Sequence, residues 1–404
     1  MSEEILNVQE ELNEQMQIRR DKLAEYEADG IYPFGQRFVV KDHAKEIKDD
    51  FFLKYDGQPV VIAGRLMTIR SHGKTAFANV RDKSGDIQVY FRKDVLGEEN
   101  YKYVKMLDIG DIVGIEGHVF KTHTGEVTIK VDKLTLLSKS LRPLPEKWHG
   151  LKDTELRYRQ RYVDLIVNPE VRDTFVKRSQ IVAKIREYMM RDGFMEVETP
   201  MMHAIPGGAA ARPFITHHNA LDIDIYMRIA PELYLKRLIV GGMDRVFEMN
   251  RCFRNEGIDN RHNPEFTTIE SYQAYGDVED AIRLTENLVS YCAQEVLGTQ
   301  EITYQGTEIN LTPPWNRITM AEGVKKYTGE DFDAVTTVEE ARAIADRLNV
   351  EYTDNDGIGK ILNLCFEDYV EENLIQPTIV YGHPKEISPL AKASRENPLA
   401  TERF

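Results

Sequence analysis

The chain has 404 residues, of which 42% are hydrophobic and 29% charged, and its formal net charge is −15. This length predicts two or three domains, and no apolar stretch approaches the roughly 18 residues of a membrane-spanning helix, which excludes a helical membrane protein. The acidic start, MSEEILNVQEELNEQ, and three scattered cysteines argue against secretion, a disulfide framework and a zinc site, and favour a cytoplasmic protein with reduced thiols.

Residues 4–28 predict a helix, because they lack Gly and Pro and are rich in Glu, Gln, Lys and Leu; Asp29, Gly30 and Pro33 would end it. Its basic side chains Arg19, Arg20 and Lys22 could contact phosphate, although a solvated helix face is the simpler interpretation. We predict that residues 1–55 form an N-terminal helical extension.

Residues 56–145 predict a small β-barrel of the OB type. Five segments rich in β-branched and aromatic residues are separated by turn residues and interrupted by one helical piece, 98–107; the strands are expected at 60–70, 75–82, 85–93, 111–122 and 125–140. Residues 57–145 carry 14 Lys and Arg against ten Asp and Glu, a local charge of +4 on an otherwise acidic chain. That excess is either chance or the docking face for a polyanion.

The Pro-containing segment LRPLPEKWHGL, residues 141–151, predicts a linker, and residues 146–404 predict a second, mixed domain. Helices are expected at 153–165, 170–192, 232–240, 278–297 and 338–348, and strands at 194–200, 224–231, 245–254 and 266–275. The strands lie close together in sequence, which favours an antiparallel sheet flanked by helices. The predicted fold class is therefore α+β, with an OB-fold barrel followed by this sheet.

The stretch FRNEGIDNRHNPEFTTIE, residues 253–270, predicts a charged β-hairpin. Alternate strand residues share a face, so Arg254 and Glu256 can face the same side, and so can Phe266, Glu270 and Tyr272. Arginine binds phosphate in a bidentate manner, a phenyl face and an arginine plane can sandwich a purine, and carboxylates bind ammonium groups. An exposed, salt-bridged hairpin is the alternative, but surface ion pairs are worth only about 0–1 kcal/mol, so stability alone does not require them.

FRNEGIDNRHNPEF resembles motif 2 of the class II aminoacyl-tRNA synthetases, and GFMEVETPMM, residues 193–202, resembles motif 1, whose strand ends at Pro200. Residues 203–242 and the barrel segments AGRLMTIR, GKTAF and GDIQVYFRKD resemble the lysine-specific, bacterial-type members, the lysyl-tRNA synthetases. This resemblance implies a homodimer formed through motif 1 and an ATP-dependent enzyme that uses Mg²⁺ and joins L-lysine to tRNA(Lys).

The resemblance also implies roles for individual residues. Arg254 would hold the α-phosphate of ATP as the catalytic residue, Glu256 would meet the adenine amino group, and His262, Asn263 and Phe266 would contact the phosphates and adenine. The lysine site would contain Gly208, Glu232, Glu270 and Tyr272. The anticodon would be bound by Arg70, Phe77, Gln88 and Glu126, although Phe77 could also belong to the barrel core.

In the resembling family the catalytic domain continues past the segment that matches VYGHPKEISPLAK, residues 380–392. That continuation holds motif 3, the acidic Mg²⁺ ligands and the carboxylate for the lysine side chain. The resemblance therefore implies that the metal ligands lie beyond Phe404, the last residue, and that none lies within residues 1–404. Two alternatives to a lysine–tRNA ligase stay open: a catalytically incomplete tRNA-binding fragment, and an aspartate- or asparagine-specific relative.

Overall fold

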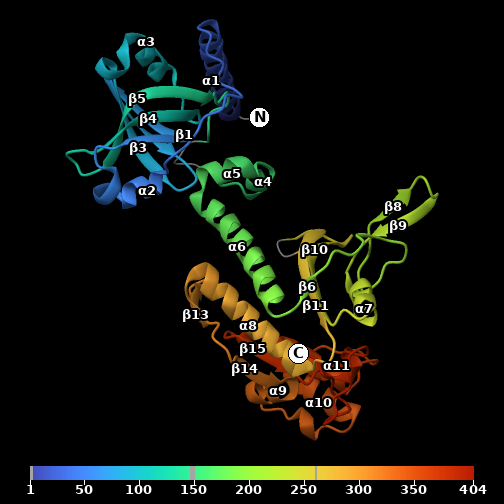
Figure 1. The fold of residues 1–404 in the computed structure, drawn as a ribbon. Coiled ribbons are helices and arrows are strands. Elements are labelled where there is room, and N and C mark those ends of the chain that lie inside the picture. The colour runs from blue at the N-terminus through green and yellow to red at the C-terminus, as the bar shows by residue number, and fades with distance from the viewer. Residues whose placement is uncertain (1–2, 146–150, 260–261) are drawn as a thin grey trace. The chain divides into compact units, whose positions relative to one another are not determined.

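A computed structural model describes residues 3–145, 151–259 and 262–404, and the chain divides into two units, residues 1–172 and 173–404 (Figure 1). Residues 146–150 of the predicted linker and Arg261 of the predicted hairpin loop lie outside the described residues. None of the described helices is both long and apolar enough to cross a bilayer.

Unit 1 begins with three helical elements, α1 (Glu3–Ala28), α2 (Ala44–Asp49) and the π-helix η1 (Phe51–Tyr55). The barrel follows as β1 (Pro59–His72), β2 (Thr75–Arg81), β3 (Asp86–Arg92), α3 (Lys93–Met106), β4 (Ile112–Lys121) and β5 (Val127–Ser138). Two short helices, α4 (Thr154–Arg159) and α5 (Arg161–Val167), come next, and α6 (Pro169–Arg191) continues into unit 2. Every strand predicted for the barrel is present, and the predicted helix starts earlier and is kinked at Gly97.

The five strands close into a barrel in the order β1-β2-β3-β5-β4, which confirms the predicted architecture. Burial alternates strictly along β2 and β3, so Ala76, Ala78 and Val80 point into the core and Phe77 points outward. The strict alternation excludes Phe77 from the inward-facing row.

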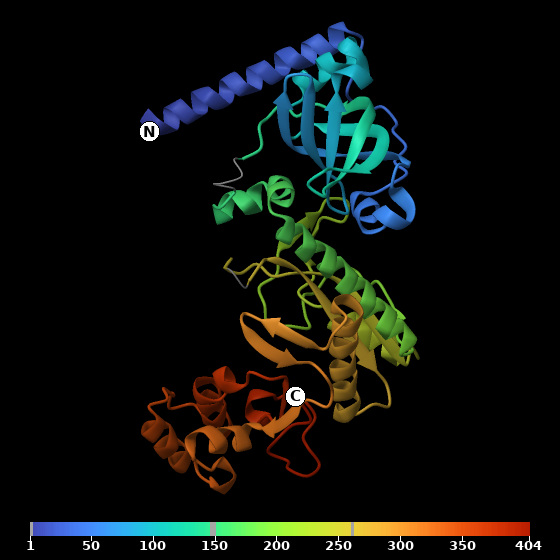
Figure 2. The same cartoon turned by 90° about the vertical axis from the view of Figure 1, so that its left-hand side faces the viewer.

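The barrel core also takes side chains from the segment before β1. Tyr26, Ile47, Phe51 and Tyr55 belong to the same buried cluster as the strand residues. The helices α2 and α3 lie at opposite ends of the barrel (Figures 1 and 2). Core packing therefore runs across the boundary that the sequence predicts at residue 56.

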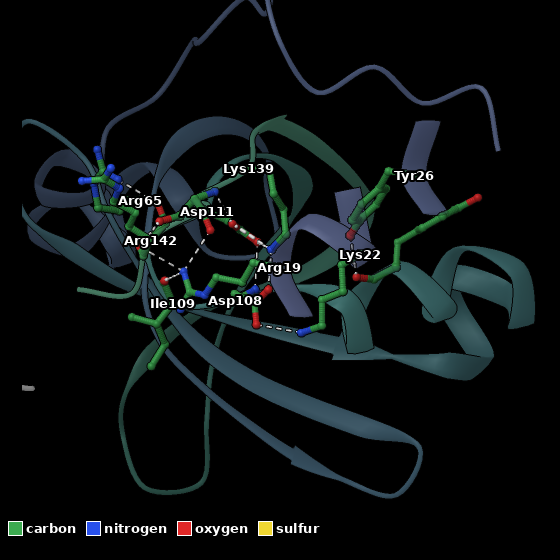
Figure 3. Close-up of polar contacts among 12 residues, drawn as sticks. Arg19, Lys22, Tyr26, Arg65, Asp108, Ile109, Asp111, Lys139 and Arg142 are labelled. Carbon is green, nitrogen blue, oxygen red and sulfur yellow. Dashed lines mark hydrogen bonds and ion pairs between the residues drawn. The ribbon is translucent and has the colours of Figure 1, made fainter. Parts of the chain in front are cut away.

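A buried charge cluster fastens α1 to the barrel (Figure 3). Lys139, whose side chain is fully buried, binds Asp111 at 2.8 Å and Asp108 at 2.5 Å, and Lys22 binds Asp108 at 2.7 Å. Arg19 donates to the backbone carbonyls of Ile109, Ser140 and Arg142. Arg19 and Lys22 are therefore engaged with the barrel, and neither interpretation drawn from the sequence holds for them, whereas Arg20 is exposed, as expected of a solvated helix face.

The elements of unit 2 follow α6 in chain order. The first strands are β6 (Met195–Glu196), β7 (Met202–His203), β8 (Ile215–His218) and β9 (Ile223–Met227), followed by α7 (Glu232–Val240). The hairpin is β10 (Arg245–Phe253) and β11 (Glu265–Gln273), and α8 (Val278–Leu297) follows it. Then come β12 (Glu301–Tyr304), β13 (Thr307–Asn310), β14 (Asn316–Thr319), α9 (Met320–Thr328), η2 (Phe332–Ala334), α10 (Val338–Leu348), α11 (Ile358–Tyr369), η3 (Glu371–Asn373), β15 (Thr378–Tyr381) and η4 (Lys385–Ile387).

The hairpin β10–β11 is antiparallel, as predicted, and β6 adds to β10 in parallel, which the sequence did not indicate. One face of this sheet is covered by helices: Phe247 packs with Met189 and Phe194, and side chains of α6 and α8 join them. The register places Phe247 opposite Ser271 and Glu248 opposite Glu270, so the even-numbered residues form the other face.

A second core in unit 2 lies among α9, α10 and α11, which contribute Val324, Ala341, Ile361 and Cys365. Cys252, Cys292 and Cys365 are all buried free thiols, as predicted, and burial raises the pKa of Cys365 to about 11. These thiols are structural residues with little thiolate character.

Candidate functional site

The face of the hairpin that α6 and α8 leave uncovered carries most of the predicted site. Phe266 lies opposite Cys252, and Glu270 and Tyr272 follow it along β11 on the same face. The backbone N–H of Arg254 donates to the carbonyl of Pro264 at 2.8 Å, which extends the ladder one residue past β10. The structure thus brings Arg254, Phe266, Glu270 and Tyr272 together, as the alternation predicts.

Arg254 and Phe266 form a cation–aromatic pair, with the guanidinium carbon 5.2 Å from the ring centroid. A purine therefore does not fit between these two side chains as they lie here, and the stacking of adenine on Phe266 stays a prediction. The Nε of Arg254 is buried and has no hydrogen-bond partner among the described residues. A buried donor without an acceptor is suited to an incoming phosphate oxygen.

The predicted residues of the hairpin loop are exposed. Glu256 lies beyond β10, so the strand alternation that would put it beside Arg254 does not extend to it. His262 is held by Asp259, whose carboxylate lies 2.7 Å from Nδ1 and accepts the backbone N–H of His262 at 2.7 Å. Asn263 donates to the carbonyl of Glu265 at 2.9 Å. The loop therefore orients the side chains of His262 and Asn263. Within the described residues, no strand pairing determines on which face of the hairpin the side chain of Glu256 lies.

An acidic group lies next to this arginine–phenyl pair. Tyr272 donates its hydroxyl to Glu270 at 3.3 Å, and Lys236 binds Glu232, the first residue of α7, at 2.5 Å. Burial raises the pKa of Glu270, and the carboxylates of Glu232 and Glu248 raise it further. The pKa of Tyr272 is raised by burial and by the carboxylates of Glu270 and Glu232. Half-buried carboxylates that lack a full set of partners are complementary to an ammonium group.

Gly208 lies directly against this acidic group. Its φ of +89° is disfavoured for residues with a side chain, and a Cβ at this position would fall 2.9 Å from Cβ of Glu232. The glycine therefore lets the backbone pass close to Glu232, and its approach to the amino acid stays a prediction.

A buried ion pair between Arg228 and Glu248, at 2.6 Å, lies next to Glu270 and was not predicted. Its sequence signal is weak: Arg228 interrupts the apolar run of the segment YMRIAP, residues 226–231, and was assigned to a strand without a role.

The barrel carries the second group of predicted residues. Across the sheet, Arg70 lies opposite Phe77, and Phe77 lies opposite Tyr90. The rings of Phe77 and Tyr90 stack at 4.3 Å, and Phe120 lies 6.3 Å from Tyr90. These residues form an outward-facing aromatic row. Tyr90 and Phe120 were missed, although the alternation that places Gln88 on this face also places Tyr90 there.

Gln88 and Glu126 border this row. The carbonyl oxygen of Gln88 accepts the hydroxyl of Thr128 at 2.8 Å, which leaves its amide nitrogen to donate. Glu126 is exposed at the start of β5 and pairs with Lys48 at 3.2 Å. Stacking rings flanked by a cation, an amide and a carboxylate can hold and discriminate the bases of a single strand.

The described residues, which extend to Phe404, contain no cluster of three or more His, Cys, Asp or Glu that could hold a metal ion. The Mg²⁺ that the resemblance implies, and the ligands that would hold it, stay predictions.

Comparison with known proteins covers both units. Residues 153–404 match the family model of the class II tRNA synthetases (D, K and N), and residues 60–137 match that of the OB-fold nucleic acid binding domain.

The chain is similar along its whole length to three bacterial proteins named lysine–tRNA ligase. It is 56% identical over 404 residues to the protein of Thermoanaerobacter pseudethanolicus, covering all of this chain and 81% of that protein. Identity is 57% over 395 residues with the Carboxydothermus hydrogenoformans protein and 54% over 401 residues with the Bacillus cereus protein. Each alignment covers 98% of this chain. It covers 81% of the Carboxydothermus hydrogenoformans protein and 80% of the Bacillus cereus protein.

Proposed function

This chain belongs to the class II tRNA synthetases of the D, K and N group, and we propose that it acts as a lysine–tRNA ligase, which activates L-lysine with ATP and transfers it to the 3′ end of tRNA(Lys). The three relatives above carry that name, and they match this chain at 54–57% identity.

One observation supports the proposal best: a phosphate-binding group and an ammonium-binding group share one face of one hairpin. Arg254 offers a buried unpaired donor beside Phe266, and Glu270 and Tyr272 follow on the same strand face. Bound together there, ATP and an amino acid would meet with the amino acid's ammonium on Glu270 and Glu232. Holding two reactants in this way removes much of the entropic barrier to their reaction.

The reaction needs no nucleophilic side chain. A carboxylate oxygen of lysine forms a bond to the α-phosphorus of ATP, the bond from that phosphorus to the bridging oxygen breaks, and pyrophosphate leaves. Arg254 would stabilise the negative charge that builds on the α-phosphate oxygens. A ribose hydroxyl of the terminal tRNA nucleotide then attacks the lysyl carbonyl, loses its proton and releases AMP.

The barrel would bind the anticodon on its aromatic row. Phe77 and Tyr90 would stack on unpaired bases, and Arg70, Gln88 and Glu126 would contact base edges. The local charge of +4 on residues 57–145 supports a polyanion as the partner, despite the net charge of −15.

The protein would act as a cytoplasmic homodimer. Nine consecutive residues of α6, 173–181, are exposed, and among them Phe175, Val176 and Ile181 are apolar. Exposed apolar side chains on this helix suit a subunit interface formed by motif 1.

Lysine-dependent exchange of pyrophosphate into ATP tests the first step, and charging of tRNA(Lys) tests the second. We expect exchange with lysine and little with aspartate or asparagine. Equal exchange with aspartate would contradict the lysine assignment. Binding of tRNA without any exchange would favour the non-catalytic alternative.

A further inference from the structure

The buried pair Arg228–Glu248 joins three segments next to the acidic group of Glu232, Glu270 and Tyr272. Arg228 is fully buried and donates from Nε to the carbonyl of Arg251 at 2.7 Å and from Nη1 to Glu248 at 2.6 Å. Glu248 also accepts the hydroxyl of Thr199 at 2.6 Å, and Thr199 directly precedes Pro200 at the end of motif 1. The pair therefore has a single defined geometry.

Glu248 faces a like charge. It lies directly opposite Glu270 in the ladder between β10 and β11, on the same face of the sheet. Two carboxylates in directly opposing positions destabilise a sheet unless a cation lies near them. Arg228 is that cation: its guanidinium binds Glu248, and its Nη2 is buried without a partner among the described residues.

We propose that Arg228 and Glu248 are positioning residues that set the ionisation of Glu270 and thereby the affinity for the substrate's ammonium group. Glu248 is saturated by Arg228 and Thr199, so it does not compete for the substrate. Glu270 accepts only the tyrosine hydroxyl among its contacts in the described part of the chain, so its charge stays available. This inference rests on the proposed function, because it concerns the same amino acid site.

Several charged or titratable groups surround Glu270, and the pair acts among them. Burial and the carboxylates of Glu232 and Glu248 favour its protonated form, whereas Arg228 and the hydroxyl of Tyr272 favour the carboxylate. Cys252 on β10 is also close enough to interact with it, and Lys236 on α7 already binds Glu232. Of the two cations, Arg228 acts on Glu270 itself.

The two members of the pair therefore have opposite effects. Arg228→Met removes the stabilising cation, so Glu270 should ionise at a higher pH. The pH below which kcat/KM for lysine falls, the acid limb of its pH profile, should therefore move about one pH unit upward. Glu248→Gln removes the opposing carboxylate and leaves Arg228 charged, so the limb should move downward. A role in packing alone would give both variants a loss without such opposite shifts.

The experiment measures lysine-dependent pyrophosphate exchange and lysine binding by calorimetry across pH, on the wild-type chain and four variants. Arg228→Lys keeps the charge but loses the Nε contact, so its acid limb should stay near that of the wild type. The double variant R228M/E248M replaces the pair with apolar groups, which buried pairs often tolerate, and tests whether the fold survives. Its limb should lie between those of the two single variants.

Shifts in the same direction for both single variants, or no shift in either, would overturn the inference. If the wild-type chain neither binds nor activates lysine, the proposed function fails instead. The two failures are therefore distinguishable.

Discussion

The backbone of Gly208 lies directly against the side chain of Glu232: a Cβ on Gly208 would lie 2.9 Å from Cβ of Glu232 and 3.2 Å from Cβ of Ala230. Neither neighbour is the far end of a flexible side chain, so neither can yield easily. The contact ties the conformation of the loop before β8 to the position of a carboxylate predicted to bind lysine.

Gly208→Ala should therefore weaken lysine binding. The positive φ costs a residue with a side chain about 1–2 kcal/mol, and displacement of Glu232 adds to this, so we expect KM for lysine to rise by at least ~10-fold. Gly207→Ala is the matched control, because its Cβ would meet Cδ1 of Leu233, an exposed side chain, at 2.7 Å. An equal rise in both variants would contradict the specific role of Gly208.

Arg254→Ala should reduce pyrophosphate exchange by at least ~100-fold, because the charge on the α-phosphate loses its donor. Binding of an anticodon stem-loop should not change. Arg251→Ala is the control: Arg251 lies on the other face of the hairpin and pairs with Glu265 at 3.4 Å, so its loss should leave exchange nearly intact. Near-normal exchange by Arg254→Ala would refute the phosphate assignment.

Phe77→Ala should weaken tRNA charging and leave exchange unchanged. Loss of one stacked base costs about 1–3 kcal/mol, so KM for tRNA should rise about 5- to 150-fold. Tyr32→Ala removes a ring that is 68% exposed elsewhere in unit 1 and should have little effect. Loss of exchange or of the folded barrel in Phe77→Ala would instead indicate a packing role.

Glu270→Gln should abolish lysine binding and yet raise the melting temperature near neutral pH. Because the pKa of Glu270 is raised in the folded state, the folded state holds the proton more tightly than the unfolded state. The ionised carboxylate therefore costs stability above the folded pKa, and this cost disappears as the pH falls through it. Thermal unfolding between about pH 4 and pH 8 should show that the gain in melting temperature of Glu270→Gln over the wild type becomes smaller at low pH.

The control for that experiment is Glu265→Gln, at an exposed position on the opposite face of the hairpin. Its melting temperature should follow that of the wild type at each pH. A gain in Glu270→Gln that does not depend on pH would show that the stabilisation has another origin.

Ile181→Asp should convert the proposed dimer into monomers, since an interface that closed over the new carboxylate would bury an unpaired charge. Sedimentation velocity measures this directly. Leu297→Asp adds the same charge at an exposed apolar position of α8, outside residues 173–181, and should leave the dimer intact. Dimers that persist in Ile181→Asp would place the interface elsewhere.

Much of the fold followed from local patterns. The five barrel strands were predictable from their β-branched and aromatic residues, whereas Phe77 stayed open between the outer face and the core until the burial alternation along β2 placed it outward. The hairpin face of Phe266, Glu270 and Tyr272 was predictable for the same reason, because side chains of a strand alternate whatever lies beyond it.

Other features depend on distant segments and could not be predicted. Glu256 leaves the strand alternation because Asn255 donates its backbone N–H to the carbonyl of Arg212, which draws the chain away from the ladder. Arg228 and Glu248 lie 20 residues apart, and only the register of the sheet shows that a second carboxylate opposes them. The contacts of Arg19 could not be predicted because its partners are backbone carbonyls, which no residue type in the sequence identifies.

The buried cluster around Lys139 determines where this chain can be cut. A recombinant barrel that began at residue 56 would lose Arg19 and Lys22, leaving Asp108 with one counterion fewer and three carbonyls without their shared donor. It would also lose Tyr26, Ile47, Phe51 and Tyr55 from its core. A barrel that is to be transplanted, for example into a fusion with another enzyme, has to start before Arg19 and extend through Arg142.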